Sequence, residues 1–211
     1  MSLEQIREQN KRTVIEQALI CFAENSIENT KISDIAKKSG LAERTVYRYF
    51  SNKADIVLST AYLFWDRTVL RIENALSTNA MAHLSGIEQV EAILLLYADI
   101  FKYEPKMLIF GQEAELYLYK NGIEKDVINR PPVEYESFSA PFSKAIRLGI
   151  KDGTLRRDID IESAYYNIYS SMLGLMQKMA LDSMGSETKK IDRQKQLESY
   201  CKMIGDYLAN R

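Results

Sequence analysis

The feature that most constrains this chain is the long, nearly unbroken recurrence of apolar residues every three or four positions. Residues at this spacing share one face of an α-helix, whereas strict alternation would indicate strands. Only four prolines and nine glycines interrupt the 211 residues. The Asn121-Gly122 pair ends a helical stretch, which is typical of a helix C-cap rather than of a hairpin. The sequence therefore predicts an all-α protein.

The breaks in this periodicity predict where the helices begin and end. Thr30 and Asn52 can accept a backbone hydrogen bond as N-caps, and Asp55 follows Asn52 in an arrangement like a capping box. Pro105 suits the first position of a helix. We expect helices over residues 10–25, 31–38, 42–50, 53–76, 85–102, 105–120, 133–151, 161–182 and 191–210.

Composition indicates an ordinary globular protein, with 46% hydrophobic and 27% charged residues. No run of 18 apolar residues is present and the first residues lack a signal-peptide core, so we expect a cytoplasmic protein that does not enter a membrane. In that reducing compartment Cys21 and Cys201, both in helical apolar patterns, favour buried free thiols over a disulfide.

The charge is concentrated in one segment. Residues 31–53 carry six Lys or Arg against two Asp or Glu, a local charge of +4, although the whole chain has a net charge of −1. Such a patch attracts phosphate groups, and screening by salt limits this attraction to roughly 8–10 Å. The alternative interpretation is a solvated helix face.

Two short predicted helices flank Ser39-Gly40-Leu41, which is the pattern of a helix-turn-helix. Gly40 suits the turn because glycine adopts a positive φ without a Cβ clash, and the small Ala36 allows the two helices to cross closely. Helix pairs of this kind also occur in proteins that never bind DNA, so the spacing alone leaves both possibilities open.

The residues around this turn are more specific than its spacing. Ile15, Ala18 and Phe22 are followed by TKISDIAKKSGL over residues 30–41 and by TVYRYFSNK over residues 45–53. Without a gap, this stretch closely resembles the N-terminal domain of the tetracycline-repressor (TetR/AcrR) family of transcriptional regulators.

The resemblance implies a three-helix DNA-binding domain over residues 1–53 and a helical effector-binding and dimerisation domain over residues 54–211. It implies a homodimer that acts as a repressor on a double-stranded DNA operator and is released by a small-molecule effector. The alternative is a DNA-binding protein of the same fold without an effector, acting as an architectural or partner-regulated protein.

Carried over by position, the resemblance assigns DNA contacts to Thr30, Lys31, Arg44, Thr45, Tyr47, Arg48, Tyr49 and Lys53. It implies that Thr30 caps the second helix, that Tyr47 and Lys53 bind phosphate, and that Arg44 and Arg48 contact bases. An arginine can bridge O6 and N7 of guanine for about 1–3 kcal/mol of discrimination, whereas phosphate contacts fix register without selecting sequence. For each residue the alternative is a solvated side chain or, for Tyr49, a core aromatic.

Three positions depart from the family pattern. Ser26 stands where glycine is usual, so Asn25 or Ser26 is expected to adopt a left-handed conformation. Ala42 replaces the usual capping serine or threonine of the recognition helix, and Arg44 replaces a frequent glycine.

After residue 60 aromatic and methionine residues are frequent, and such side chains can line an adaptable apolar pocket. They more often fill a helical core. The candidate pocket residues are Phe64, Trp65, Phe110, Glu113, Tyr117, Phe138, Tyr169, Met172 and Met176. Among them, Glu113 could meet a cationic ligand.

Each of the last two predicted helices carries two apolar stripes. On the predicted helix over residues 161–182, one stripe comprises Ala164, Ile168, Met172, Leu175 and Met179, and the second comprises Tyr166, Tyr169, Leu173 and Met176. The final helix carries Leu197, Cys201, Ile204 and Leu208, with a second stripe of Tyr200, Met203 and Tyr207. A helix that is apolar on two sides must bury both. One side can face its own subunit and the other a partner in a homodimer; the alternative is a central position in a monomer.

An enzyme is the main rival class. The chain has one histidine, His83, no Cys/His cluster with metal-ligand spacing and no phosphate-binding glycine loop. We therefore expect no catalytic residue, no metal site and no cofactor.

Overall fold

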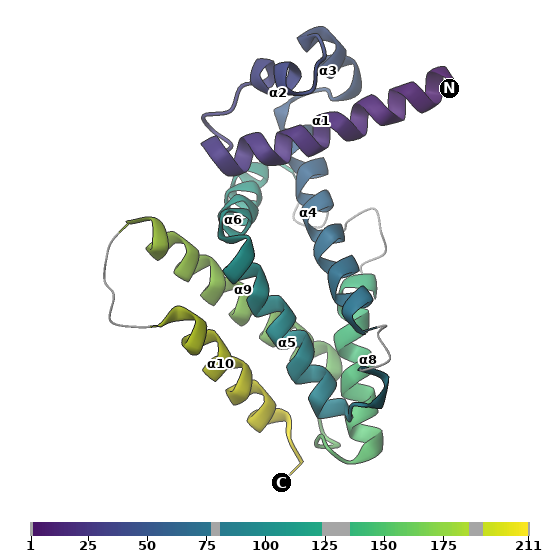
Figure 1. Cartoon of the computed structure of the whole chain (residues 1–211), viewed down its shortest axis with the longest axis vertical. Helices are drawn as coiled ribbons and strands as arrows, with labels where there is room; N and C mark the ends of the chain where they lie inside the picture. Colours follow the sequence, from purple (N-terminus) through teal and green to yellow (C-terminus); the bar gives the residue numbers. More distant parts are fainter. Residues whose placement is uncertain (1, 77–80, 124–135, 186–191, 211) are drawn as a thin grey trace. The chain divides into compact units, whose positions relative to one another are not determined.

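The computed structural model describes residues 2–76, 81–123, 136–185 and 192–210. The regular elements in these ranges are all helices, with no strand among them, which confirms the all-α prediction (Figure 1). The helices are α1 (Leu3–Asn25), α2 (Ile32–Lys38), α3 (Glu43–Tyr49), α4 (Lys53–Leu76), η1 (Met81–His83), α5 (Gly86–Tyr103), α6 (Pro105–Lys120), α8 (Glu136–Asp152), α9 (Ile161–Gly185) and α10 (Arg193–Leu208).

The chain packs as two compact units. The first comprises Met1–Arg67 and Ile109–Val133, and the second comprises Thr68–Leu108 and Glu134–Arg211. Both α4 and α6 therefore contain residues of each unit. The division into a DNA-binding domain over 1–53 and an effector domain over 54–211 concerns function and stays a prediction.

Helix α1 begins earlier than its apolar pattern predicts. Ser2 and Gln5 form a capping box, in which the Gln5 amide donates to Ser2 Oγ over 3.1 Å and the Ser2 amide donates to Gln5 Oε1 over 2.8 Å. The expected start at Asn10 was wrong because residues 3–9 are exposed and bury no apolar side chain, with Leu3 and Ile6 in solvent. The helix buries Val14, Ala18, Leu19, Cys21 and Phe22.

The helix-turn-helix prediction is confirmed in its geometry. Gly40 has a φ of 67° between α2 and α3, and the Leu41 amide donates to the Ala36 carbonyl over 3.0 Å. Ala36 and Val46 are buried between the helices. Ser26 has a φ of 69°, as expected from the missing glycine. Ala42 starts α3 without a side-chain cap, also as expected.

The predicted start of α4 is also confirmed. Asn52 Oδ1 accepts the Asp55 amide over 3.0 Å, and the Asp55 carboxylate accepts the Ser51 amide over 2.9 Å. The first bond satisfies an amide that the helix N-terminus leaves free, and the second binds the amide of the residue before the cap.

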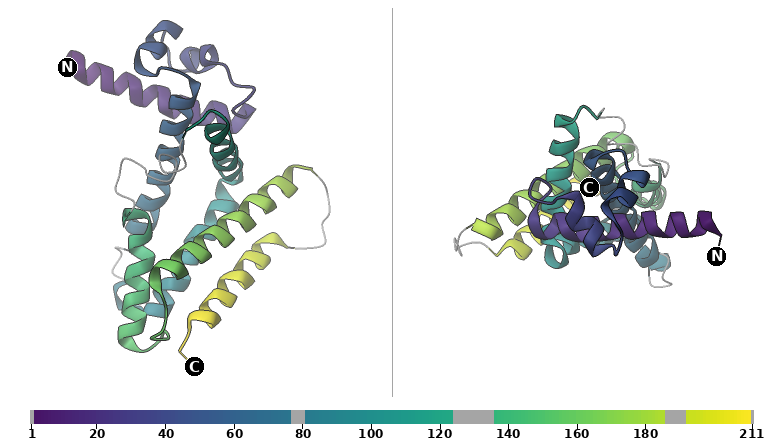
Figure 2. Two further views of the ribbon diagram at one scale, coloured as in Figure 1. Left: turned by 180° about the vertical axis from the view of Figure 1, so that it is seen from behind. Right: turned by 90° about the horizontal axis from the view of Figure 1, so that it is seen from above.

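The second unit is built around α5, which packs against α8 and α10. The backbones of α5 and α8 meet at Gly86 and Gly149, where a Cβ on Gly86 would lie 2.0 Å from the Gly149 nitrogen. The chain end is fixed by two backbone bonds, Arg156 N–H to the Leu208 carbonyl (3.1 Å) and Asn210 N–H to the Thr154 carbonyl (3.0 Å). Views from other directions show α9 and α10 side by side (Figure 2).

Both cysteines are buried free thiols, as predicted. Cys201 lies in the core of the second unit, where burial raises its pKa to about 11. Among the described residues, no helix is long and apolar enough to cross a membrane.

Candidate nucleic-acid interface

The recognition helix α3 buries one side and exposes the other. Val46 faces the core with no exposed surface, whereas Arg44 and Arg48 are exposed and Tyr47 is 49% exposed. Thr45 is half-buried. The exposed side thus combines two guanidinium groups with a phenol, which together can donate to base edges and to phosphate oxygens.

Lys53 lies at the first turn of α4, where the positive end of the helix also favours an anion. Its Nζ donates to the Glu28 carbonyl over 3.5 Å and lies 5.6 Å from the centre of the Tyr117 ring. Partial burial lowers the pKa of Lys53, and the Glu28 charge opposes this shift. The ammonium group is therefore held between the 26–29 loop and α6.

The structure corrects the prediction for Thr30. Lys31, not Thr30, occupies the N-cap position of α2, and its amide donates to Asp34 Oδ2 over 3.0 Å. Thr30 is only 2% exposed, and its hydroxyl lies 2.7 Å from the Ser26 carbonyl and 3.2 Å from that of Cys21. The side chain stabilises the 26–30 loop from inside, so its hydroxyl is not available to phosphate. Lys31 itself is exposed.

Tyr49 is half-buried at the end of α3 and is bound from two sides. Asn10 Nδ2 donates to its hydroxyl over 3.3 Å, and Arg48 Nη2 donates over 3.4 Å. The Arg48 guanidinium also lies over the Tyr49 ring, 5.2 Å from its centre. Tyr49 is therefore neither a simple core aromatic nor a free surface group. Its bond to Asn10 adds a residue of α1 to the candidate site.

The candidate pocket residues are divided between the two units. In the first unit Phe110 is 1% exposed and stacks on Phe22, with ring centres 5.9 Å apart. In the second unit Met172 and Met176 are buried, and Tyr169 stacks on Tyr165 at 5.7 Å. Phe64, in the first unit, is 3% exposed and its ring lies 4.8 Å from that of Trp65. The side chain of Phe138 lies outside the described residues.

Glu113 has a partner that sequence spacing did not suggest. Its Oε2 accepts the amide of Ile27, a buried residue in the loop that follows α1, over 3.0 Å. Phe110, Glu113 and Tyr117 thus share one face of α6 that contacts the end of α1, the 26–29 loop and the start of α4. The only sequence signal was their helical spacing, because the partners lie far away in the chain.

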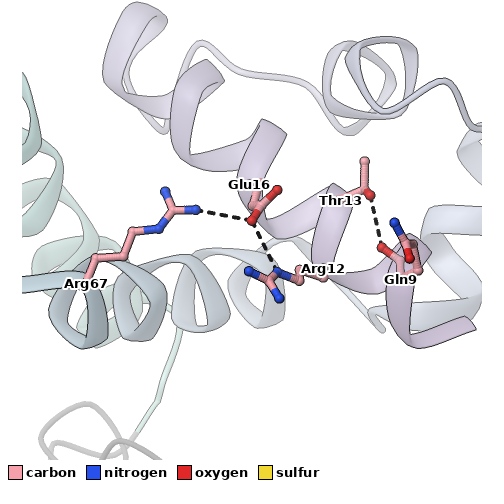
Figure 3. Close-up of polar contacts among 5 residues, drawn as sticks. All are labelled: Gln9, Arg12, Thr13, Glu16 and Arg67. Carbon is pink, nitrogen blue, oxygen red and sulfur yellow. Dashed lines mark hydrogen bonds and ion pairs between the residues drawn. The ribbon is translucent and has the colours of Figure 1, made fainter. Parts of the chain in front are cut away.

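An exposed ion-pair group joins α1 to α4. Arg12 of α1 and Arg67 of α4 both direct a nitrogen at Glu16 Oε1, at 3.3 and 3.2 Å (Figure 3). The arginine side chains are 78% and 52% exposed, so each pair contributes little, about 0–1 kcal/mol.

The stripes predicted on the last two helices are found in part. On α10 Leu197, Cys201, Ile204 and Leu208 are buried, while Met203 and Tyr207 are each 63% exposed. On α9 the two predicted stripes are mixed, since Met172, Met176 and Met179 are all buried. The exposed side of α9 carries Tyr166, from the second predicted stripe, and Leu181, which neither stripe contained, at 39% and 43% exposed.

No group of three or more His, Cys, Asp or Glu that could hold a metal occurs within the described ranges. His83, the one histidine, lies in η1 and is exposed.

Residues 14–60 match the family model described as "Bacterial regulatory proteins, tetR family". The chain is 24% identical over 160 residues to the fatty acid metabolism regulator protein of Bacillus subtilis, covering 75% of this chain and 77% of that protein. It is 23% identical over 156 residues to the HTH-type transcriptional repressor KstR2 of Rhodococcus jostii, covering 72% and 71%.

The fold is similar to that of solved regulators. The structure of FadR from Bacillus subtilis in complex with stearoyl-CoA aligns with a TM-score of 0.68 at 19% identity, covering 92% of this chain and 96% of that one. Three features agree with the fold of these regulators: the matched motif, the helix-turn-helix geometry and the helical second unit. Residues 14–60 belong to the tetR family of bacterial regulatory proteins, and the relatives that align over most of the chain are transcriptional regulators.

Proposed function

We propose that this chain is a homodimeric repressor that binds duplex DNA through α3 and dissociates from it when a small-molecule effector binds. The observation that carries this proposal is the exposed side of α3, where Arg44, Tyr47 and Arg48 face solvent beside a glycine turn. A dimer seated on a promoter would block polymerase. The relative KstR2 is described as a repressor, which supports this direction of regulation.

The contacts of the proposed site divide into two kinds. Arg44, Thr45 and Arg48 would contact bases, whereas Lys31, Tyr47 and Lys53 would bind phosphate and Tyr49 would lie beside them. Thr30 is not part of this set, because its hydroxyl is buried and bonded within the loop.

Exposed apolar side chains on α9 and α10 support the homodimer. Met203 and Tyr207 are each 63% exposed, and a Cβ placed on Gly174 would meet no other atom within 4 Å. Exposed apolar side chains on these neighbouring helices suit burial against a second copy of the chain. Tyr207→Glu should give a monomer by light scattering, whereas Tyr119→Glu on α6, where the tyrosine is 73% exposed, should leave the dimer intact.

The face of α6 formed by Phe110, Glu113 and Tyr117 supports a route for the effector signal. This face contacts the 26–29 loop and Lys53. A shift of α6 would therefore move a phosphate-binding lysine together with the loop that precedes α2. Since a relative is a fatty acid metabolism regulator and FadR was solved with stearoyl-CoA, stearoyl-CoA is the first effector to test.

Fluorescence anisotropy tests the proposal directly. The labelled probe is a duplex from the region upstream of the chain's own gene, with a shuffled duplex as control. We expect tighter binding to the first duplex and release by stearoyl-CoA but not by coenzyme A alone. Binding that no acyl thioester weakens would favour the same fold without an effector, and no binding to either duplex would contradict the proposal.

A further inference from the structure

The hydroxyl of Tyr49 is in an unusual position for a surface phenol. Its oxygen accepts one hydrogen bond from Asn10 Nδ2 and one from Arg48 Nη2, at 3.3 and 3.4 Å. A phenolic oxygen has two acceptor positions and one proton. With both acceptor positions used, the proton is left to be donated outward, to an acceptor such as a phosphate oxygen.

The same contact brings α1 to the recognition helix. Asn10 lies on the part of α1 that precedes its buried residues, and in Figure 1 this part runs alongside and past α3. Arg7 is exposed and lies one turn before Asn10, which places the two on one side of the helix. The pKa of Tyr49 is lowered mainly by the bond from Asn10, then by that from Arg48, with a smaller effect of the Arg7 charge.

From this geometry we propose that the first half of α1 is part of the DNA-binding surface. Arg7 binds a backbone phosphate next to the contacts of α3, and Asn10 is a positioning residue that directs the Tyr49 proton to phosphate. Neither residue belongs to the motif that matches the family, which begins at residue 14. The inference rests on the proposed DNA binding and extends its footprint along α1.

Removal of one phosphate contact changes the salt dependence of DNA affinity by a defined amount. Each contact releases counterions, so the slope of log affinity against log salt changes by about 0.9 per phosphate. Such a contact carries no sequence information, so its loss weakens binding to all duplexes alike.

Arg7→Ala tests the first part, with Arg12→Ala as the matched control. Both substitutions remove one positive charge from the same half of α1, but Arg12 pairs with Glu16 on the side of α4 (Figure 3). We expect Arg7→Ala to reduce the salt slope by about 0.9 per subunit, on the upstream and the shuffled duplex alike. Arg12→Ala should leave the slope near that of the unchanged chain. Equal slopes for the two variants would overturn the role of Arg7.

A double-mutant cycle tests the second part. Asn10→Ala should weaken DNA binding several-fold in the unchanged chain but have little effect when Tyr49→Phe has already removed the hydroxyl. Equal losses in both backgrounds, or no loss in either, would overturn the role of Asn10. Circular dichroism melting of each variant shows whether the helices remain folded.

The failure of this inference can be told apart from that of the proposed function. If the unchanged chain binds neither duplex, DNA binding itself is wrong. If it binds with a steep salt dependence while both α1 tests give the contrary result, only the extension along α1 is wrong.

Discussion

Helices α3 and α6 carry similar residues at similar spacing but present them to different surroundings. On α3 the face with Tyr47 and its neighbouring arginines is exposed, Tyr47 by 49%. On α6 Phe110 is 1% exposed and Glu113 accepts a backbone amide from the loop after α1. The comparison shows that charged and aromatic residues at helical spacing do not by themselves indicate a binding face, because packing against other parts of the chain can bury or bind them.

The largest expected effect breaks the packing of α6. Phe110→Ala removes a ring stacked on Phe22 and should lower the free energy of unfolding by about 3–5 kcal/mol. Leu116→Ala on the same helix, where the leucine is 53% exposed, should change it by less than about 0.5 kcal/mol. Urea denaturation followed by circular dichroism measures both. Equal effects would mean that α6 does not pack on α1 in this way.

On α3 the expected effect is on specificity rather than on stability. Arg44→Ala or Arg48→Ala should reduce the preference for the upstream over the shuffled duplex by about 1–3 kcal/mol, because a bidentate guanine contact is lost. Anisotropy titrations with both duplexes give this difference. A uniform loss on both duplexes would assign these arginines to phosphate.

The hydrogen bond of Glu113 allows a sharper test of the α6 face. Glu113→Ala leaves the Ile27 amide without its partner and should cost about 1–3 kcal/mol of stability, while Glu113→Gln keeps an acceptor oxygen and should cost less. Glu115→Ala, at an exposed position, is the control. Denaturation midpoints that do not distinguish Glu113→Ala from Glu115→Ala would contradict the contact.

The smallest effect concerns the exposed ion pairs between α1 and α4. Glu16→Gln removes the carboxylate that Arg12 and Arg67 share and should change stability by no more than about 1 kcal/mol, decreasing further at high salt. Thermal melting at low and high salt measures this. A larger loss of stability would show that these ion pairs hold α4 against α1.

Sequence predicted the features that depend on neighbouring residues. The turn at Gly40, the cap at Asn52 and the buried stripe of α10 are all encoded within a few positions. The prediction failed where the partner of a side chain is distant in the sequence or where the side chain turns inward. The Thr30 hydroxyl turns inward to loop carbonyls, leaving Lys31 at the cap position, and the partner of Glu113 lies 86 positions away. Asn10 was missed because it was taken as the start of a helix that begins at Leu3.

The salt dependence of DNA binding by the unchanged chain tests the account most directly. Lys31 and Lys53 in each of two subunits predict at least four neutralised phosphates, so the slope of log affinity against log salt should be about −3.6 or steeper. The upstream duplex should remain the tighter ligand at every salt concentration. A slope near zero, or equal affinity for the upstream and shuffled duplexes, would contradict the assignment of α3 as a sequence-selective DNA-binding helix.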